Sequence, residues 1–293
     1  MLIIGCSHGR HLAANVAKKL KKPYSELKVK KFPDGELHIR FLKNVKGNTV
    51  VLVQSFYGSI NDNVMEALFA AYTAKDLGAK KIILAAPYFP YLRQDERFKS
   101  GECVSVEVMA KLVDNAFNGI FIIDPHLHRE KDLRHIFRIK SKKLTANNLI
   151  ADFIKKNYNV KNCLIAGPDW ESYKWAEKVA NIVNCDSVIL EKKRLSGRKV
   201  IVKLSKKIDL RGKNVIIIDD MISTGNTIIE TIKNLKKLGA RKFNVIAVHG
   251  IFAENALNKL KKASAKVVTT NTIPNKAARI DVSSVIAESL KDS

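Results

Sequence analysis

Short apolar runs rich in β-branched residues alternate with helical patterns along the whole chain of 293 residues. Several runs are apolar without interruption, as strands are when helices cover both faces of their sheet. Two helical patterns, 63–77 and 227–238, are followed by Gly78 and Gly239, and glycine is the usual residue after the last turn of a helix. This alternation predicts an α/β fold with parallel sheets. The predicted strands include 49–54, 81–86, 119–123, 163–166, 188–190, 214–218 and 243–248.

One pattern occurs twice, at an offset of about 160 residues, which is too long for a solenoid and fits a duplicated domain. Residues 78–82 and 239–243 each follow a predicted helix and lead into a predicted buried strand. The strand 50–53 precedes the first of these helices, and 215–218 precedes the second. The sequence therefore predicts two halves with related folds.

The length allows two domains that each bury a core of their own. We place the first domain at residues 1–142 and the second at residues 143–277. The tail, 278–293, contains a predicted strand at about 281–285 and can join either domain.

Composition and charge narrow the function classes. No apolar run approaches the ~20 residues that span a bilayer, and the opening residues lack the basic segment of a signal peptide, so we expect a cytoplasmic protein. The formal net charge of +24 favours nucleotides, sugar phosphates or nucleic acid as partners. Most lysines fall on the predicted solvated faces of helices, and no nucleic-acid recognition motif accompanies them. The four scattered cysteines form no C-x-x-C pair, so a zinc ribbon is not indicated.

The most informative stretch is 215–227, where an apolar strand ends in Asp219 and Asp220 before a short loop and a helix. The carboxyl ends of parallel strands are where open α/β sheets bind ligands, and a helix N-terminus favours anions. The loop residues are small or carry hydroxyls, and they are Ser223, Thr224, Gly225, Asn226 and Thr227. Together they predict a pocket for a phosphate monoester, with the two carboxylates beside it to accept sugar hydroxyls.

A helix capped by Ser223 or Thr224 is the structural alternative for this stretch. It does not account for two adjacent carboxylates at the end of a buried strand, which repel each other unless a ligand or cation compensates. The matching strand of the first half ends in Gln54 and Ser55 instead. The sequence therefore predicts the carboxylates that accept sugar hydroxyls in the second half alone.

This stretch is similar to the ribose 5-phosphate loop of the type I phosphoribosyltransferase fold. From Met1 to its end the chain resembles the ribose-phosphate diphosphokinases, or phosphoribosyl pyrophosphate synthases, which contain two copies of that fold. The resemblance implies two tandem type I phosphoribosyltransferase-like domains with parallel sheets. It also implies transfer of the β,γ-diphosphoryl group of ATP to ribose 5-phosphate with Mg²⁺, by in-line attack of the anomeric hydroxyl. No residue stands out as a general base.

Two segments of the first half acquire a role in ATP binding through this resemblance. Taken alone, 32–36 is a turn between two strands, and 91–97 is a polar loop after a strand. In the family the first reaches the adenine of ATP on a neighbouring subunit, which implies at least a dimer. The residues so assigned to ATP are Phe32, Asp34, Gly35, Glu36, Arg93, Gln94, Asp95 and His126.

The resemblance also supplies metal-binding and catalytic residues. An Asp-x-His of this kind contacts Mg-ATP in the family, which implies that Asp124 and His126 lie near the metal, while Asp169 helps to hold it. A mobile loop of the family carries a lysine and an arginine two residues apart, which match Lys192 and Arg194. These two would close over the triphosphate, with Arg194 also reaching ribose 5-phosphate. Without the resemblance, a histidine at a strand end is usually structural.

The sequence departs from the family in three places. Trp170, Glu171 and Ser172 stand where relatives have a small, Gly-rich turn. Ser223 stands where many have Asp, and Asn226 stands where most have a second Gly. Because Asn tolerates a left-handed backbone, we expect the loop to form with an altered affinity for the sugar phosphate.

Two alternatives remain open. A phosphoribosyltransferase that consumes the same product would need only one copy of the fold, and the duplication and the 32–36 loop argue against it. A regulatory or nucleic-acid-binding relative without catalysis would be expected to have lost Lys192, Arg194, His126 or the Asp pair, and all of these are present. No G-x-x-x-x-G-K-[ST] occurs, so the chain holds ATP without a P-loop.

Overall fold

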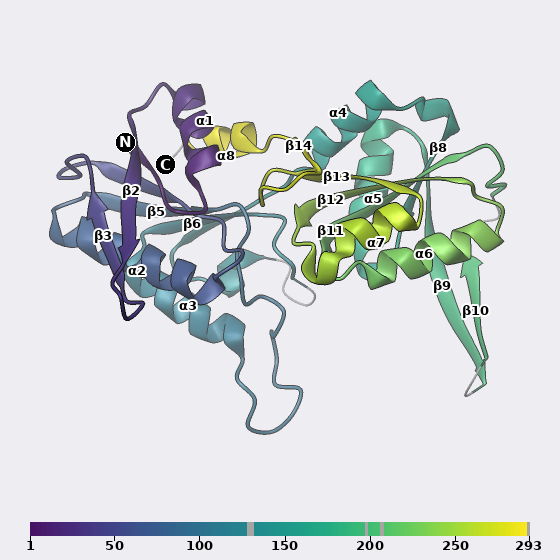
Figure 1. The fold of residues 1–293 in the computed structure, drawn as a ribbon, viewed down its shortest axis with the longest axis horizontal. Helices are drawn as coiled ribbons and strands as arrows, with labels where there is room; N and C mark the ends of the chain where they lie inside the picture. The colour runs from purple at the N-terminus through teal and green to yellow at the C-terminus, as the bar shows by residue number, and fades with distance from the viewer. Residues whose placement is uncertain (128–131, 197–198, 206–207, 292–293) are drawn as a thin grey trace. The chain divides into compact units, whose positions relative to one another are not determined.

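The computed structural model describes residues 1–127, 132–196, 199–205 and 208–291, which form two compact units (Figure 1). Unit 1 consists of Met1–Thr145 together with the residues from Val282 onward, and unit 2 consists of Ala146–Asp281. The division falls slightly after the position predicted from the sequence. Within the described residues, no helix combines the length and the apolar character needed to cross a membrane.

Unit 1 contains a seven-stranded sheet in the order β3-β2-β1-β4-β5-β6-β7, in which only β3 is antiparallel to its neighbour. Helices α1 and α8 cover one face, and α2 and α3 cover the other (Figure 1). The strands are β1 Leu2–Gly5, β2 Tyr24–Lys31, β3 Leu37–Phe41, β4 Thr49–Val53, β5 Lys81–Ala86, β6 Gly119–Ile123 and β7 Lys140–Leu144. The helices are α1 Arg10–Leu20, α2 Ile60–Asp76, α3 Ser105–Ala116, α8 Ser283–Leu290 and the 3-10 turn Leu133–His135.

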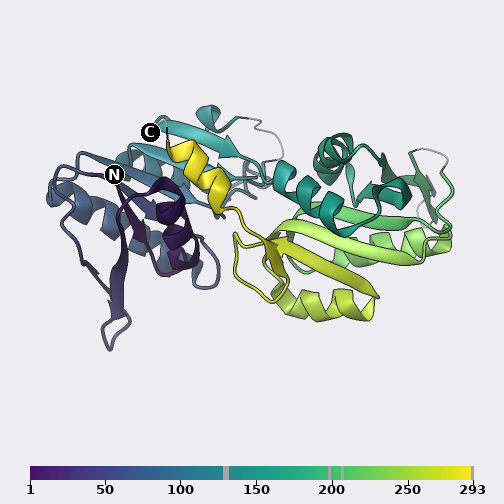
Figure 2. The same cartoon turned by 90° about the horizontal axis from the view of Figure 1, so that it is seen from above.

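Unit 2 repeats this arrangement in the order β10-β9-β8-β11-β12-β13-β14, with β10 antiparallel to β9. Helix α5 packs with α4, and α6 packs with α7, on opposite faces (Figure 2). The strands are β8 Cys163–Gly167, β9 Asp186–Ser196, β10 Lys199–Leu204, β11 Asn214–Ile222, β12 Lys242–Gly250, β13 Ala265–Thr270 and β14 Ala278–Ile280. The helices are α4 Asn147–Asn157, α5 Trp170–Val183, α6 Asn226–Lys237, α7 Ala256–Lys262 and the 3-10 turns Val160–Asn162 and Ala253–Asn255.

The predicted duplication is confirmed strand by strand, since each strand of unit 1 has a counterpart at the same place in the sheet of unit 2. Every residue of β1 and β6 in unit 1, and of β8 in unit 2, is buried, which explains why these strands are apolar without alternation. Each unit has its own apolar core between sheet and helices, with Leu52 and Ile122 in the first and Ile217 and Val245 in the second.

The strand predicted at 281–285 is wrong. The last strand, β14, ends at Ile280, and α8 follows it. Ile286 and Leu290 lie one helical turn apart and are buried beside α1, so this short apolar segment follows a helical period. The tail is divided, since β14 stays in unit 2 and α8 returns to unit 1.

Two strands of unit 2 are longer than the sequence predicted. β11 continues to Ile222 because β12 pairs with it in parallel as far as Ile222↔Gly250, so the two carboxylates lie within the strand. β9 continues to Ser196 as one arm of a hairpin with β10. Its pairing with β8 ends at Ile189, so the rest of the hairpin extends beyond the sheet (Figure 1).

Candidate active site

Asp219 and Asp220 form the centre of the site on β11, where their exposed fractions are only 9% and 4%. The Ser172 hydroxyl donates to Asp219 Oδ1 over 2.7 Å, and the Asp220 backbone N–H donates to the same oxygen over 3.0 Å. Burial raises the pKa of the Asp219 carboxyl well above its usual range, and the Asp220 charge raises it further. The pair therefore favours a partner that brings hydroxyl donors or positive charge.

Ser172 connects this pair to a third carboxylate. Asp169 is the N-cap residue of α5, and its Oδ1 accepts the Ser172 backbone N–H over 2.9 Å. Gly167 ends β8 so close to α5 that a Cβ there would lie 2.6 Å from Tyr173 Cα. The strand thus passes directly into the helix, and the first turn of α5 carries Ser172 to β11. The departure at 170–172 produces a well-capped helix, and Ser172 is a site residue that the sequence analysis did not identify.

The loop after β11 leaves the N-terminus of α6 open. Gly225 is the N-cap residue in a left-handed conformation, with φ +74°, and no side chain caps the helix. The alternative of a helix capped by Ser223 or Thr224 is therefore wrong. Backbone N–H groups in the first turn of α6 have no intrahelical acceptor, which makes this end suited to an anion.

The expectation that Asn226 would need a left-handed backbone is also wrong. Asn226 is the first residue of α6, and the preceding Gly225 makes the left-handed turn. Ser223 and Thr224 are half-buried, while Asn226 and Thr227 are exposed. All five residues predicted to hold the sugar phosphate thus lie at the same end of β11 as the carboxylates.

Lys192 and Arg194 lie on β9, in the part of the hairpin beyond the sheet. Their backbones pair with Val202 and Val200 of β10. Their side chains lie outside the residues that the structure describes, so their predicted contacts remain predictions.

In unit 1 the predicted adenine loop forms the tip of the hairpin between β2 and β3. Phe32 N–H donates to Glu36 O over 2.8 Å, and Gly35 turns the chain at φ +97°. Phe32 is half exposed, at 50%, and its ring edge meets His38 at 5.7 Å between centroids. Asp34 and Glu36 are exposed as well, so the whole tip is accessible to a ligand.

The predicted ATP segment 91–97 runs along the N-terminal end of α3. The Ser105 hydroxyl donates to Tyr91 O over 3.0 Å, and Val106 N–H donates to Gln94 O over 3.4 Å. Arg93 is exposed, whereas Gln94 and Asp95 are half-buried. The first turn of α3 therefore fixes the backbone of the segment.

Asp124 and His126 follow β6 at its carboxyl end. Asp124 is buried and has φ +37°, a conformation that L side chains seldom adopt. Its backbone N–H donates to Leu144 O over 2.9 Å, which holds the turn, and His126 is half-buried beside it. These two residues belong to unit 1, while Asp169 belongs to unit 2. Among the described residues, no cluster of three or more His, Cys, Asp or Glu side chains is close enough to form a metal site.

Comparison with known proteins finds relatives along nearly the whole chain. Residues 1–116 match the model for the N-terminal domain of ribose phosphate pyrophosphokinase, and residues 135–286 match a phosphoribosyl transferase domain. The chain is 38% identical to a ribose-phosphate pyrophosphokinase of Methanothermobacter thermautotrophicus, over 99% of this chain and all of the relative. It is 35% identical to a ribose-phosphate pyrophosphokinase of Pyrococcus furiosus, over 96% of this chain and 97% of the relative.

A solved structure agrees with these relatives. The crystal structure of phosphoribosylpyrophosphate synthetase from Mycobacterium smegmatis superposes with a TM-score of 0.86 at 26% identity. The match covers 99% of this chain and 97% of that one, so it includes both units.

Proposed function

This chain belongs to the ribose-phosphate pyrophosphokinase family, and from that premise we propose how its residues make 5-phosphoribosyl 1-pyrophosphate. The enzyme transfers the β,γ-diphosphoryl group of ATP to the 1-hydroxyl of ribose 5-phosphate, and AMP leaves. The observation that carries the assignment to this site is the buried pair Asp219 and Asp220 beside the open N-terminus of α6. The oxygen of the 1-hydroxyl forms a bond to the β-phosphorus as the bond to the AMP oxygen breaks.

Ribose 5-phosphate binds across β11 and α6. The 5-phosphate accepts from the first backbone N–H groups of α6 and from the hydroxyls of Ser223, Thr224 and Thr227. The sugar hydroxyls donate to the Asp219 and Asp220 carboxylates, which relieves the electrostatic cost of burying them side by side. This arrangement orients the 1-hydroxyl for attack, and positioning supplies much of the catalysis in phosphoryl transfer.

Mg²⁺ fits the donors that this chain offers. The adjacent buried carboxylates of Asp219 and Asp220 are hard oxygen ligands, and a partner with positive charge would offset their repulsion. In unit 1, Asp124 and His126 would contact the Mg²⁺ of bound ATP, and in unit 2 Asp169 would supply a carboxylate to Mg²⁺. When bound, it neutralises charge on the transferring group.

ATP is held by residues of unit 1. Phe32 stacks on the adenine, Asp34 and Glu36 accept from its amino group, and Arg93 contacts phosphate or ribose oxygens. Gln94 accepts or donates at a ribose hydroxyl. Lys192 and Arg194, on the extended β9–β10 hairpin, supply positive charge to the triphosphate in the transition state.

The adenine loop acts on a neighbouring subunit, so the enzyme works as at least a dimer. A surface suited to self-association lies on α2 and α3, where apolar side chains are exposed at helical spacing. Their exposed fractions range from 39% to 50%, and they are Met65, Phe69, Tyr72, Val108 and Leu112. Size-exclusion chromatography with light scattering measures the mass of the assembly, and a monomer would contradict this proposal.

A coupled assay with Mg-ATP and ribose 5-phosphate, following AMP, tests the reaction. We expect AMP release that requires the sugar, and a loss of about 10²- to 10³-fold in Lys192→Ala, since removing one preorganised positive group typically costs that much. Lys237→Ala, at an exposed position in the last turn of α6, is the matched control and should retain activity. If no AMP forms, while pyrophosphate is released from 5-phosphoribosyl 1-pyrophosphate with a nucleobase, the chain is a phosphoribosyltransferase instead.

A further inference from the structure

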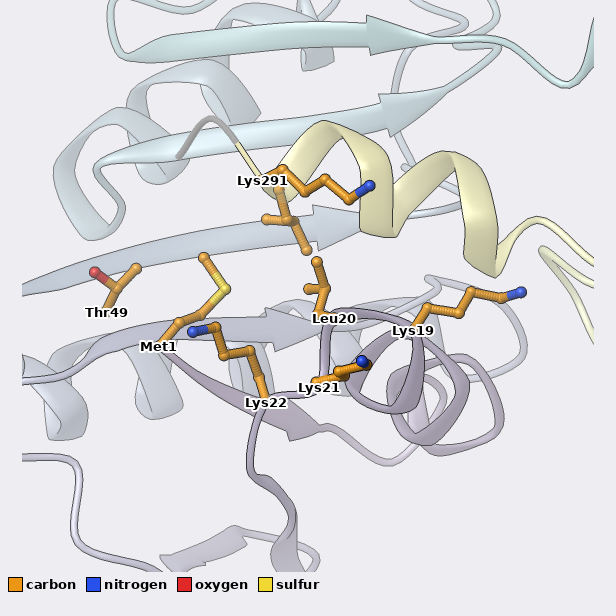
Figure 3. Close-up of a pocket in the computed structure, with 8 residues that line it drawn as sticks. Met1, Lys19, Leu20, Lys21, Lys22, Thr49 and Lys291 are labelled. Atoms are coloured by element: carbon orange, nitrogen blue, oxygen red, sulfur yellow. The ribbon is translucent and has the colours of Figure 1, made fainter.

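A second concave site lies at the opposite edge of the sheet of unit 1, at the amino ends of β1 and β4. It is a cavity of about 430 Å³ where the C-terminal ends of α1 and α8 meet (Figure 3). This volume lies within the usual range for small-molecule sites. The carboxyl ends of β5 and β6, which lead toward the proposed ATP-binding residues, are at the other edge of this sheet. The lining residues are Met1, Lys19, Leu20, Lys21, Lys22, Thr49, Leu290 and Lys291.

Four lysines and no acidic residue line this pocket. Across the part of the chain that the structure describes, none of the four forms an ion pair. The helix dipoles favour Lys19 and Lys21 at the end of α1 and Lys291 at the end of α8, whereas Lys22 lies beyond either helix. Like charges so gathered repel one another, and a multivalent anion would offset that repulsion.

Lys21 also has a backbone conformation that lysine seldom adopts. It ends α1 with φ +53° and ψ +42°, in the left-handed region. At the ends of α2 and α6 the left-handed residue is a glycine, Gly78 or Gly239, which pays no steric penalty there. A strained residue that persists at a cavity is grounds for considering a ligand-binding role.

The matching place in unit 2 shows that the fold does not require these lysines. Helix α5 follows β8 as α1 follows β1, and it ends at Asn184 with φ +61°. Cys185 and Asp186 come next, and no lysine occurs between Ile182 and Asp186. The basic cluster is therefore specific to unit 1.

We propose that this pocket binds a chain of linked phosphates. Lysine ammonium groups are compact charges that suit phosphate oxygens, and four of them spread around one cavity suit several linked phosphates better than a single one. The remaining lining consists of the apolar residues Met1, Leu20 and Leu290 and of Thr49, with no aromatic ring to stack on a base. This favours an inorganic phosphate chain over a nucleotide. The bound chain would hold the ends of α1 and α8 together.

Isothermal titration calorimetry with inorganic tripolyphosphate tests this site. In Lys21→Gln/Lys22→Gln/Lys291→Gln we expect binding at least about tenfold weaker, since each exposed charge contact contributes modestly and three are lost. The control Lys261→Gln/Lys262→Gln/Lys266→Gln removes the same charge from exposed positions of unit 2, and its affinity should stay within about twofold of wild type. Any binding of tripolyphosphate at the reaction site is shared by the wild type and both triple variants, so it does not affect the difference between them.

An equal loss in both triple variants would show attraction by net charge alone and would overturn the proposal. Unchanged affinity in the pocket variant would overturn it too, as would orthophosphate binding as tightly as tripolyphosphate. Circular dichroism checks that each variant folds. If the triple variant does not fold, the binding measurement is made with the single variant Lys22→Gln, whose substitution lies outside the helix.

The single variant Lys21→Gly separates binding from structure. Glycine relieves the left-handed strain, so the melting temperature without ligand should rise, while tripolyphosphate binds about threefold more weakly. A rise in melting temperature with unchanged affinity would mean that Lys21 has no part in binding, and would contradict the proposal.

Discussion

The two units have the same strand order, yet they differ at the strand to which we assign the reaction chemistry in unit 2. β4 of unit 1 is followed by Gln54 and Ser55, whereas β11 of unit 2 carries Asp219 and Asp220. All four residues are buried. The sheet therefore accepts either set of side chains, and we propose that the carboxylates of unit 2 make its edge able to bind a sugar.

In unit 1 two buried side chains at this edge accept hydrogen bonds from the backbone of the loop between β1 and α1. Gln54 Oε1 accepts the His8 backbone N–H over 2.9 Å, and Glu66 Oε1 accepts the Ser7 backbone N–H over 2.7 Å. Both acceptors are buried beneath the loop between β1 and α1. In unit 2 the equivalent loop supplies one hydroxyl, from Ser172, to a pair of carboxylates. At the first edge the two buried oxygen acceptors bind backbone N–H groups of the same unit, whereas at the second edge two adjacent buried carboxylates favour an external donor.

The two hairpins also occupy equivalent places in the two units and carry different residues. β2–β3 and β9–β10 are the antiparallel pairs at equivalent edges of the two sheets. The first has Phe32 at the start of its tip, and the second carries Lys192 and Arg194 on β9. One topological feature is thus proposed to recognise adenine in one half and to stabilise charge in the other.

The largest effect should come from giving unit 2 the residues of unit 1. In Asp219→Gln/Asp220→Ser we expect kcat/KM for ribose 5-phosphate to fall by at least about 10³-fold, because two acceptors that orient the sugar are lost together. Stability should rise by about 1–2 kcal/mol, since two buried, repelling carboxylates are removed. Steady-state AMP release and chemical denaturation measure the two quantities.

Opposite signs for activity and stability are the test of this first prediction. A variant that loses activity and also unfolds more easily would mean that the pair serves the fold. An active variant would exclude these carboxylates from the site.

The reverse change, a carboxylate placed in unit 1, should lower the stability of the protein. Gln54→Glu keeps the side chain's shape but buries a carboxylate beside Glu66, so we expect unfolding to become easier by about 2–4 kcal/mol. Burial lowers the pKa of His8, which is therefore neutral at neutral pH and does not offset the added charge. The new carboxyl would have a raised pKa in the folded state, so the loss of stability should grow as pH rises above its unfolded value.

Denaturation at acidic and at neutral pH measures this second effect. Gln54→Met, which removes the hydrogen bond without adding charge, is the control and should cost less than Gln54→Glu at neutral pH. Equal costs at both pH values would show that charge is not the cause.

A smaller effect is expected from Ser172→Ala. Its hydroxyl donates to Asp219, and loss of one buried hydrogen bond to a charged group costs about 1–3 kcal/mol, so KM for ribose 5-phosphate should rise by about 5- to 150-fold. KM for ATP should change little, and Ser172→Thr should restore much of the loss. A uniform fall in kcat without a change in KM would contradict this role.

Much of the fold could be predicted from the sequence. Continuous apolar runs indicate buried strands, and a glycine after a helical pattern indicates the end of a helix. The pairing of segments that are far apart in the chain could not be predicted from the sequence. The extension of β11 depends on its register with β12, and the position of α8 depends on its contact with α1. The Asp pair was evident as charge in an apolar strand, whereas Ser172 is an ordinary helix residue until the fold places it beside Asp219.

The smallest effect concerns Asn226, whose identity seemed important from the sequence. It occupies the first position of α6 with helical geometry, so Asn226→Gly should lower stability by less than about 1 kcal/mol, the usual helix cost of glycine. KM for ribose 5-phosphate should stay within about twofold, because the backbone N–H remains in place. The neighbouring variant Gly225→Ala provides the contrast. Its φ of +74° strains any residue with a Cβ, and that strain costs about 1–3 kcal/mol. If Asn226→Gly proved the more damaging of the two by denaturation or by KM, the left-handed turn would lie one residue later, and the site would hold its phosphate through a different set of amides.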